Sequence, residues 1–166
     1  GEIFQALQSG TLDAAEFVGP YNDLALGFYQ VCKNYYFPSF VEPGLATELV
    51  VSKAKYQELP SDLQAIIRDC SQAEYDAVAA DFAANDPRAL QTLVNEHGVN
   101  IRYFPDEILE AGAAAAKEIL EGLLDSSDPL TKKTAESFVS AFKIVRQKTE
   151  STDSPFIRAR EKYFTL

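Results

Sequence analysis

Two glutamates stand out in this sequence because of their surroundings. Glu16 and Glu42 each lie at the end of an apolar extended run, and a turn containing Gly and Pro follows each of them. Burying a carboxylate in such a run costs on the order of several kcal/mol unless a cation or hydrogen-bond donors meet it. Each glutamate therefore needs a partner if its run is buried. A surface strand with Glu16 facing outward also explains the local pattern.

Paired carboxylates at strand ends suit either binding or catalysis. The ends of strands are where α/β lobes place their ligands. Two carboxylates also serve as acid and as nucleophile or base in glycoside hydrolysis, although no further catalytic constellation accompanies this pair. A third interpretation is a helical interaction or structural module, which would need an exposed apolar face. The residues by themselves leave these three functions open.

Several motifs around the two glutamates match one protein family in the same order. Residues 1–16 resemble its helix-to-strand element, Phe17 takes the place of the usual Trp, and Gly-Pro-Tyr-Asn-Asp follows at 19–23. The aromatic cluster at 35–38 then leads into Phe-Val-Glu-Pro-Gly at 40–44, which is similar to the family's aromatic-Glu-Pro-Gly signature. The chain thus resembles the solute-binding subunits of tripartite ATP-independent periplasmic (TRAP) transporters, in the DctP-like branch. The subgroup it resembles most binds 2-oxo or 2-hydroxy monocarboxylates.

The resemblance implies a two-lobed fold that is larger than this chain. Members run to roughly twice 166 residues, the chain contains no Met, and it opens directly in a helical pattern. We therefore expect the α/β fold of one type II periplasmic-binding-protein lobe, with a long bracing helix and C-terminal helices, as a fragment of a two-lobe protein. Residues 1–150 are expected to form the C-terminal half, comprising the second lobe and the bracing helix. Residues 151–166 are expected to form a C-terminal tail.

The function implied by the resemblance is transport, with no enzymatic activity. A member captures a small organic carboxylate in the periplasm and delivers it to the membrane permease subunits of a TRAP transporter. The formal net charge of −10 argues against nucleic acid as a partner, because no patch of Lys and Arg is present to displace counterions. No apolar run approaches the roughly 18 residues of a membrane span, and a signal peptide is expected in the N-terminal half.

The resemblance also assigns roles to individual residues. Glu16, Glu42 and the backbone carbonyl of Phe17 are implied to hold a sodium or calcium ion that bridges to the ligand carboxylate. Such an ion is physically reasonable, because two carboxylates would otherwise repel an anionic substrate. Phe17 keeps the apolar wall of a Trp but loses its ring N–H, and Tyr21 and Asn22 either supply a polar ligand contact instead or only shape the turn. The Arg that holds the substrate carboxylate in this family would come from the other half.

Hydrophobic periodicity and turn residues predict the elements that position these side chains. Ser61 to Gln64 has the spacing of a capping box, and Pro87 should kink or break the long helix that follows. The predicted helices lie before Gly10, at 21–31, from 61 towards 97, at 106–124 and at 128–148. The predicted strands lie at 12–17, 34–37, 45–51 and 99–104, and a loop is predicted at 151–155.

The last long helix carries an apolar stripe that is too rich for a free surface helix. In the relatives that the chain resembles, a long C-terminal helix can exchange between two copies, so we expect a homodimer. The stripe consists of Ala135, Phe138, Val139, Phe142 and Val145. The two cysteines, Cys32 and Cys70, are too few for a disulfide framework and are expected to be buried free thiols.

Overall fold

The structure of the chain is a computed structural model that describes residues 2–39 and 48–164. It divides into two compact units, residues 1–105 and 106–166. Glu42 falls between the two described stretches, so the second glutamate of the predicted pair lies outside the described residues. The predicted division at residue 150 stays a prediction.

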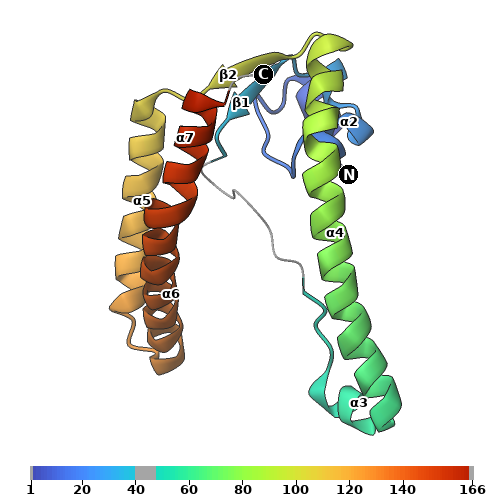
Figure 1. Cartoon of the computed structure of the whole chain (residues 1–166), viewed down its shortest axis with the longest axis vertical. Helices are drawn as coiled ribbons and strands as arrows, with labels where there is room; N and C mark the ends of the chain where they lie inside the picture. The colour runs from blue at the N-terminus through green and yellow to red at the C-terminus, as the bar shows by residue number, and fades with distance from the viewer. Residues whose placement is uncertain (1, 40–47, 165–166) are drawn as a thin grey trace. The chain divides into compact units, whose positions relative to one another are not determined.

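The first unit is organised around one long helix, α4, which runs without interruption from Ser61 to Asn95 (Figure 1). The short helix α3, Lys53–Glu58, precedes it, and α2, Pro20–Leu26, packs against its C-terminal half. The break predicted at Pro87 is absent. The two most buried residues of the helix, Ala89 and Leu93, follow within two turns of this proline. Burying them requires the helix to continue, which outweighs the one backbone hydrogen bond that proline removes.

The capping box predicted at the start of α4 does not form. Pro60 occupies the cap position and has no N–H for a glutamine side chain to accept from, so the reciprocal pattern is impossible. The Gln64 side chain instead donates to the carbonyl of Leu59 at 2.8 Å, and the Tyr56 hydroxyl donates to the carbonyl of Gln64 at 3.0 Å. These bonds fasten α3 to the first turn of α4.

The described residues contain a two-stranded parallel sheet made of β1, Asn34–Phe37, and β2, Asn100–Tyr103. The register pairs Asn34 with Asn100 and Phe37 with Tyr103. Both strands were predicted from the sequence and are confirmed. The strands predicted at 12–17 and 45–51 are wrong where the chain is described, since 12–17 and 48–51 have no regular structure. An extended apolar run becomes a strand only beside a partner, and neither run pairs with a described strand.

Glycines in the left-handed region end the shorter helices of the first unit. Gly10 (φ 74°) ends α1, Ile3–Ser9, as predicted. Gly27 (φ 74°) ends α2 and starts the 3₁₀ turn η1, Phe28–Gln30, so the single helix predicted over 21–31 is split. Gly98 (φ 65°) lies in the turn between α4 and β2, and the N–H of Val99 then donates back to the carbonyl of Leu93.

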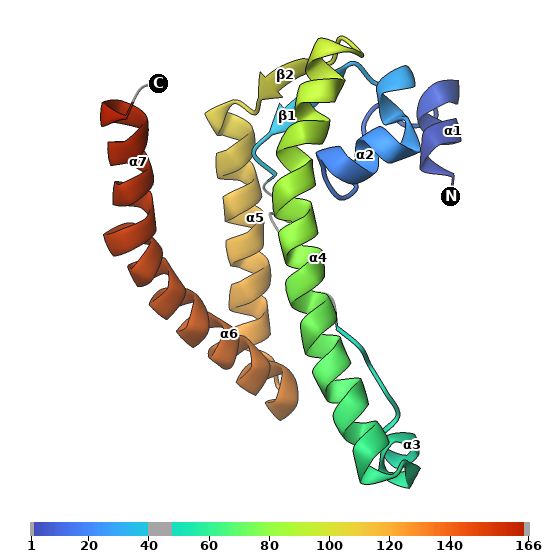
Figure 2. The ribbon, with the colours of Figure 1, turned by 45° about the vertical axis from the view of Figure 1, so that its right-hand side comes forward.

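The second unit is a set of consecutive helices (Figure 2). Its elements are α5, Asp106–Leu124, α6, Pro129–Lys148, the π-helical turn η2, Thr149–Asp153, and α7, Ser154–Tyr163. The Asp128 carboxylate caps α6 by accepting the Thr131 N–H at 2.8 Å, and these hydrogen bonds lower its pKa. The loop predicted at 151–155 is wrong, because Lys148 bonds to Asp153 across η2 and Pro155 is tolerated in the first turn of α7.

Apolar side chains are unevenly covered in both units. On α6, Ala135 is buried, whereas Phe138 and Phe142 stack on each other and are 58% and 52% exposed. Both cysteines are free, as predicted, but Cys70 is exposed and Cys32 is only half-buried. In the described ranges no helix has the length and apolar character needed to cross a membrane.

Candidate functional site

The first unit contains a cavity of about 1040 Å³ whose walls come from segments far apart in the sequence. The irregular segment between α1 and α2 forms one wall, and β1 with the start of η1 forms another. Asp86 and Leu93 of α4 also line it. The acidic residues on these walls are Asp13, Glu16, Asp23 and Asp86. Lys33 is the basic residue among the described lining residues, so acidic side chains outnumber basic ones there, and an anion entering the cavity meets a net field of its own sign.

Two of the predicted site residues, Glu16 and Phe17, lie side by side on the cavity wall. The Phe17 ring packs edge-on against Phe28, with ring centroids 5.7 Å apart, and Phe28 stacks on Phe4 of α1. The remaining 41% of the surface of Phe17 is exposed. The Glu16 carboxylate is exposed and forms no hydrogen bond or ion pair with a described residue. Glu16 thus has the open oxygen atoms that a cation site requires.

Tyr21 and Asn22 lie in the first turn of α2, behind the cavity wall and not on it. The backbone N–H of Tyr21 donates to Asp86 Oδ1 of α4 at 3.0 Å, and its ring packs edge-on against Phe82 with centroids 5.8 Å apart. Asn22 carries a buried side-chain oxygen without a partner among the described residues. In this structure Tyr21 helps to seat α2 on α4. Contact of Tyr21 or Asn22 with a ligand stays a prediction.

A buried pair that sequence reasoning missed, Asp23 and Tyr35, lines the same cavity as Glu16 and Phe17. Asp23 is only 9% exposed, and its Oδ2 accepts a hydrogen bond of 2.5 Å from the Tyr35 hydroxyl of β1. Its other oxygen, Oδ1, is buried and has no hydrogen-bond partner in the described chain. The sequence gives one hint that Asp23 is buried: its spacing from Gly27 places both residues on the same side of a helix. In the structure both residues are buried.

Burial dominates the electrostatics of this pair. It raises the pKa of the Asp23 carboxyl above its ordinary value, and the nearby charges of Asp86 and Glu16 raise that pKa further. The Tyr35 hydroxyl and the Val18 backbone amide act in the opposite direction and lower the pKa of Asp23 in part. Burial also raises the pKa of Tyr35, so the phenol stays protonated as the donor.

Sequence comparison identifies the family of the chain. The family described as bacterial extracellular solute-binding protein, family 7 (DctP), matches residues 1–126. The chain belongs to this family. DctP-family proteins are solute-binding proteins of transport systems rather than enzymes, and the family is extracellular or periplasmic. A curated relative, the monocarboxylate 2-oxoacid-binding periplasmic protein of Nostoc sp., is 31% identical over 121 residues. That match spans 73% of this chain and 33% of the relative.

Solved structures of DctP-family relatives match the chain over nearly its whole length. A TRAP periplasmic solute-binding protein from Pseudoalteromonas atlantica, crystallised with sodium and pyruvate, is 30% identical with a TM-score of 0.85. One from Colwellia psychrerythraea, with calcium and pyruvate, is 30% identical with a TM-score of 0.87. One from Bordetella bronchiseptica, a dimer with copurified calcium and picolinate, is 28% identical with a TM-score of 0.68.

The chain covers about half of each solved relative, namely 48%, 48% and 49% of their chains, while 96%, 95% and 96% of its own residues are matched. The predicted fold class, one lobe of a type II periplasmic-binding protein with a long helix and C-terminal helices, is thereby confirmed. Its helix-rich make-up with a small parallel sheet agrees with part of a two-lobed DctP-family protein.

The oxygen atoms on the cavity wall are of the type that a hard cation binds, but the described residues provide too few of them for a complete site. Sodium and calcium prefer oxygen ligands, which the Glu16 carboxylate and the Phe17 carbonyl provide. Residues 2–39 and 48–164 contain no cluster of three or more acidic, His or Cys side chains arranged to hold a metal. A complete site of the predicted kind therefore needs Glu42, which lies outside the described residues, or donors from elsewhere.

The buried Asp23 carboxyl gives a testable dependence of stability on pH. Because its folded-state pKa lies above the ordinary 3.8, the folded chain binds this proton more tightly than the unfolded chain does. The free energy of unfolding should therefore fall as pH rises from about 4 through the raised pKa and then level off. Asp23→Asn should remove this decline, so the variant gains stability relative to wild type across that window.

Urea unfolding between pH 4 and pH 8, with chelator present, measures this difference. Asp76→Asn is the matched control, because Asp76 is an exposed aspartate on α4. A stability difference between Asp23→Asn and wild type that does not change with pH would contradict the assignment.

Proposed function

We propose that this protein captures a small monocarboxylate, a 2-oxo or 2-hydroxy acid, in the periplasm and delivers it to the permease subunits of a TRAP transporter. The observation that carries the proposal is the match of nearly the whole chain to TRAP solute-binding proteins crystallised with pyruvate and a cation. The curated 2-oxoacid-binding relative supports the same ligand class. The cavity in the first unit, with Glu16 and Phe17 on its wall, is the part of this chain that would contribute to the site.

We assign the cation to Glu16, the backbone carbonyl of Phe17 and Glu42. When bound, a sodium or calcium ion supplies the positive charge that lets a carboxylate enter an acidic cavity. The exposed part of Phe17 gives the short carbon chain of the ligand an apolar wall. Tyr21 and Asn22 are the candidates for a polar contact with the ligand. A cationic side chain from the rest of the protein would complete the site.

A thermal-shift screen of the intact protein tests this proposal. Pyruvate, lactate, longer 2-oxo acids and dicarboxylates are compared, each with sodium, with calcium, and with chelator in a sodium-free buffer. We expect the monocarboxylates to raise the Tm only when a cation is present, because the cation offsets the repulsion between the ligand and the acidic cavity. Ligand at 100 times its Kd adds about 2.7 kcal/mol to the free energy of unfolding. Methyl pyruvate is the control, since it keeps the carbon skeleton and lacks the carboxylate. A response to dicarboxylates alone, or to none of these acids, would refute the proposed ligand class.

We further propose that the intact protein is a homodimer in which α6 lies at the interface. Phe138, Phe142 and Val145 are more than half exposed along one side of this helix. The relative from Bordetella bronchiseptica was crystallised as a dimer, which supports the same state here. An interface would remove this apolar stripe from water, which a monomer of the described chain leaves uncovered.

A further inference from the structure

We propose that the cavity of the first unit also binds small 2-amino acids without a metal ion, because the ammonium group of such a ligand supplies the positive charge that the acidic wall attracts. This ligand class rests on the proposed function, since it would occupy the same cavity and present the same carboxylate. It adds to the 2-oxo and 2-hydroxy acids. The carboxylates that would hold the ammonium group all belong to the described residues.

The carboxylates on the cavity wall are not neutralised by the rest of the described chain. The ion pairs within residues 2–39 and 48–164 all lie outside the cavity, on α3 to α7. The Lys33 side chain donates to the carbonyl of His97 at 2.9 Å and forms no ion pair with a described carboxylate. Unpaired charges of one sign in a cavity repel each other, and a ligand cation relieves that repulsion.

Glu16 and Asp86 each bring to this wall a carboxylate oxygen that no described residue engages. The Glu16 carboxylate is exposed and forms no hydrogen bond or ion pair with a described residue. Asp86 accepts the backbone N–H of Tyr21 through Oδ1 at 3.0 Å, whereas its Oδ2 has no partner in the described chain. An ammonium group is a donor of three hydrogen bonds and accepts none, which suits such oxygens. Charge-assisted bonds of this kind are roughly twice as strong as neutral ones.

Asp23 adds a buried acceptor to the same wall. The residue is only 9% exposed, and the Tyr35 hydroxyl donates to its Oδ2 at 2.5 Å. Its Oδ1 is buried and has no hydrogen-bond partner in the described chain, which is unfavourable for any acceptor and most of all for a charged one. Burial raises the pKa of the Asp23 carboxyl, and the charges of Asp86 and Glu16 raise it further. A positive charge among these three carboxylates would stabilise the ionised form of each.

A 2-amino acid matches the proposed ligands in shape and differs from them in charge. Alanine and lactate share one carbon skeleton and one carboxylate, and they differ at carbon 2, where alanine has an ammonium group and lactate a hydroxyl group. Lactate needs a separate cation to enter an acidic cavity, whereas alanine has a positive charge fixed beside its carboxylate. The same wall would thus hold either a metal ion together with a 2-oxo or 2-hydroxy acid, or an ammonium group alone.

Calorimetry on the intact protein tests this ligand class, in a buffer that contains chelator and tetramethylammonium as its only added cation. We expect alanine to bind at least tenfold more tightly than lactate, which is the matched ligand control. N-acetylalanine, which lacks the ammonium charge, should not bind. Adding calcium in place of chelator should weaken the binding of alanine and strengthen that of lactate, because the ion and the ammonium group compete for the same carboxylates.

Two variants locate the ammonium group on the described wall. Glu16→Gln and Asp23→Asn should each weaken alanine binding at least tenfold without calcium, since each removes one negative charge from the cavity. Asp23→Asn keeps an oxygen that accepts from the Tyr35 hydroxyl, so the fold should be preserved. Glu74→Gln is the matched control, because Glu74 is exposed on α4 and does not line the cavity. Should Asp23→Asn fail to fold, Glu16→Gln decides.

The outcomes separate this ligand class from the proposed function. Lactate bound with calcium, and no alanine bound under any condition, would overturn the amino-acid class and leave carboxylate capture intact. Alanine bound only with calcium, or weakened by Glu74→Gln as much as by Glu16→Gln, would also overturn it. Alanine bound without a metal ion, while every 2-oxo and 2-hydroxy acid fails to bind, would support the amino-acid class and refute the proposed function. Failure of all these ligands would refute both.

Discussion

Replacing Glu16 or Glu42 by Gln in the intact protein should lower the affinity for a 2-oxo acid by about 100-fold or more while leaving the fold intact. Each change removes one anionic oxygen ligand of the proposed cation, and the cation is what allows an anionic ligand among acidic side chains. Even partners outside the ligand shell of a metal are worth about 10–100-fold, so a direct ligand should cost at least as much. Because Glu16 is exposed and forms no bond in the described chain, its substitution should not disturb packing.

Calorimetry in the presence of calcium measures the affinity of both variants for pyruvate. Glu74→Gln is the matched control, since Glu74 is an exposed glutamate on α4 far from the cavity lining. If both variants keep an affinity within the roughly 0.5 kcal/mol scatter of ordinary surface substitutions, the two glutamates do not hold an ion.

Replacing Phe138 and Phe142 together by Glu should convert the proposed dimer into a monomer. Burying an aromatic side chain is worth about 1.5–3 kcal/mol, and a twofold interface buries each residue twice. Placing carboxylates in that interface adds a desolvation cost. We therefore expect the dissociation constant to rise by more than about 1,000-fold.

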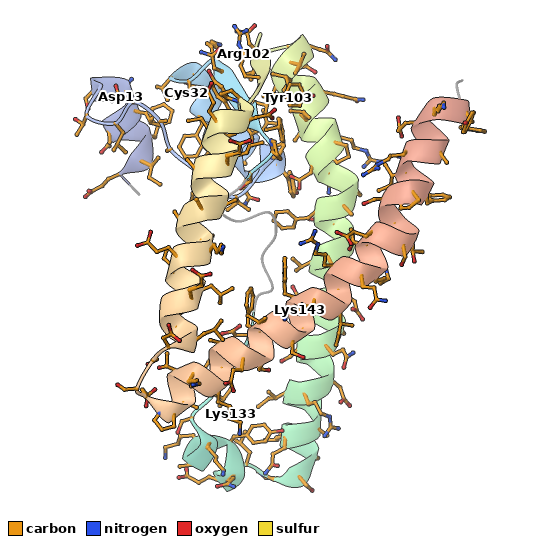
Figure 3. The ribbon with its side chains drawn as sticks, turned by 90° about the vertical axis from the view of Figure 1, so that its left-hand side faces the viewer. Asp13, Cys32, Arg102, Tyr103, Lys133 and Lys143 are labelled. Atoms are coloured by element: carbon orange, nitrogen blue, oxygen red, sulfur yellow. The ribbon has the colours of Figure 1, made fainter. Side chains whose placement is uncertain are left out.

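Light scattering across a concentration series reports the oligomeric state of the wild-type protein and of the variant with both Phe138→Glu and Phe142→Glu. Lys133→Glu is the control, because helical periodicity places Lys133 on the side of α6 away from Phe138 and Phe142. Lys133 is labelled in Figure 3. A wild-type protein that is monomeric at micromolar concentrations would remove the dimer proposal altogether.

Local signals in the sequence predicted the helices well. Gly10, the Asp128-Pro129 cap and the acidic start of α5 are decided by interactions within a few residues, and the structure places helix ends there. Two kinds of error arise where distant parts of the chain decide. The helix through Pro87 is sustained by packing against α2, and the runs at 12–17 and 48–51 do not pair with a described strand.

The candidate site shows the same division between local and distant causes. Glu16 and Phe17 could be selected from the sequence because motif resemblance names them individually, and both lie on the cavity wall. Asp23 and Tyr35 could not, because their importance depends on a bond between α2 and β1 that no local pattern encodes. An aspartate in a Gly-Pro-Tyr-Asn-Asp turn is more simply explained as turn chemistry than as a buried acceptor.

The parallel pairing of β1 with β2 has a consequence for biosynthesis. The hydrogen bond from Asn100 back to Lys33 joins residues 67 positions apart, with the whole of α4 between them. At roughly 5–20 residues per second, the ribosome needs several seconds to deliver β2 after β1 has been made. During that interval the aromatic edge Asn34–Phe37 has no partner from the described part of this chain. A nascent chain arrested between these strands should therefore bind a chaperone that recognises aromatic segments, and one arrested beyond β2 should release it.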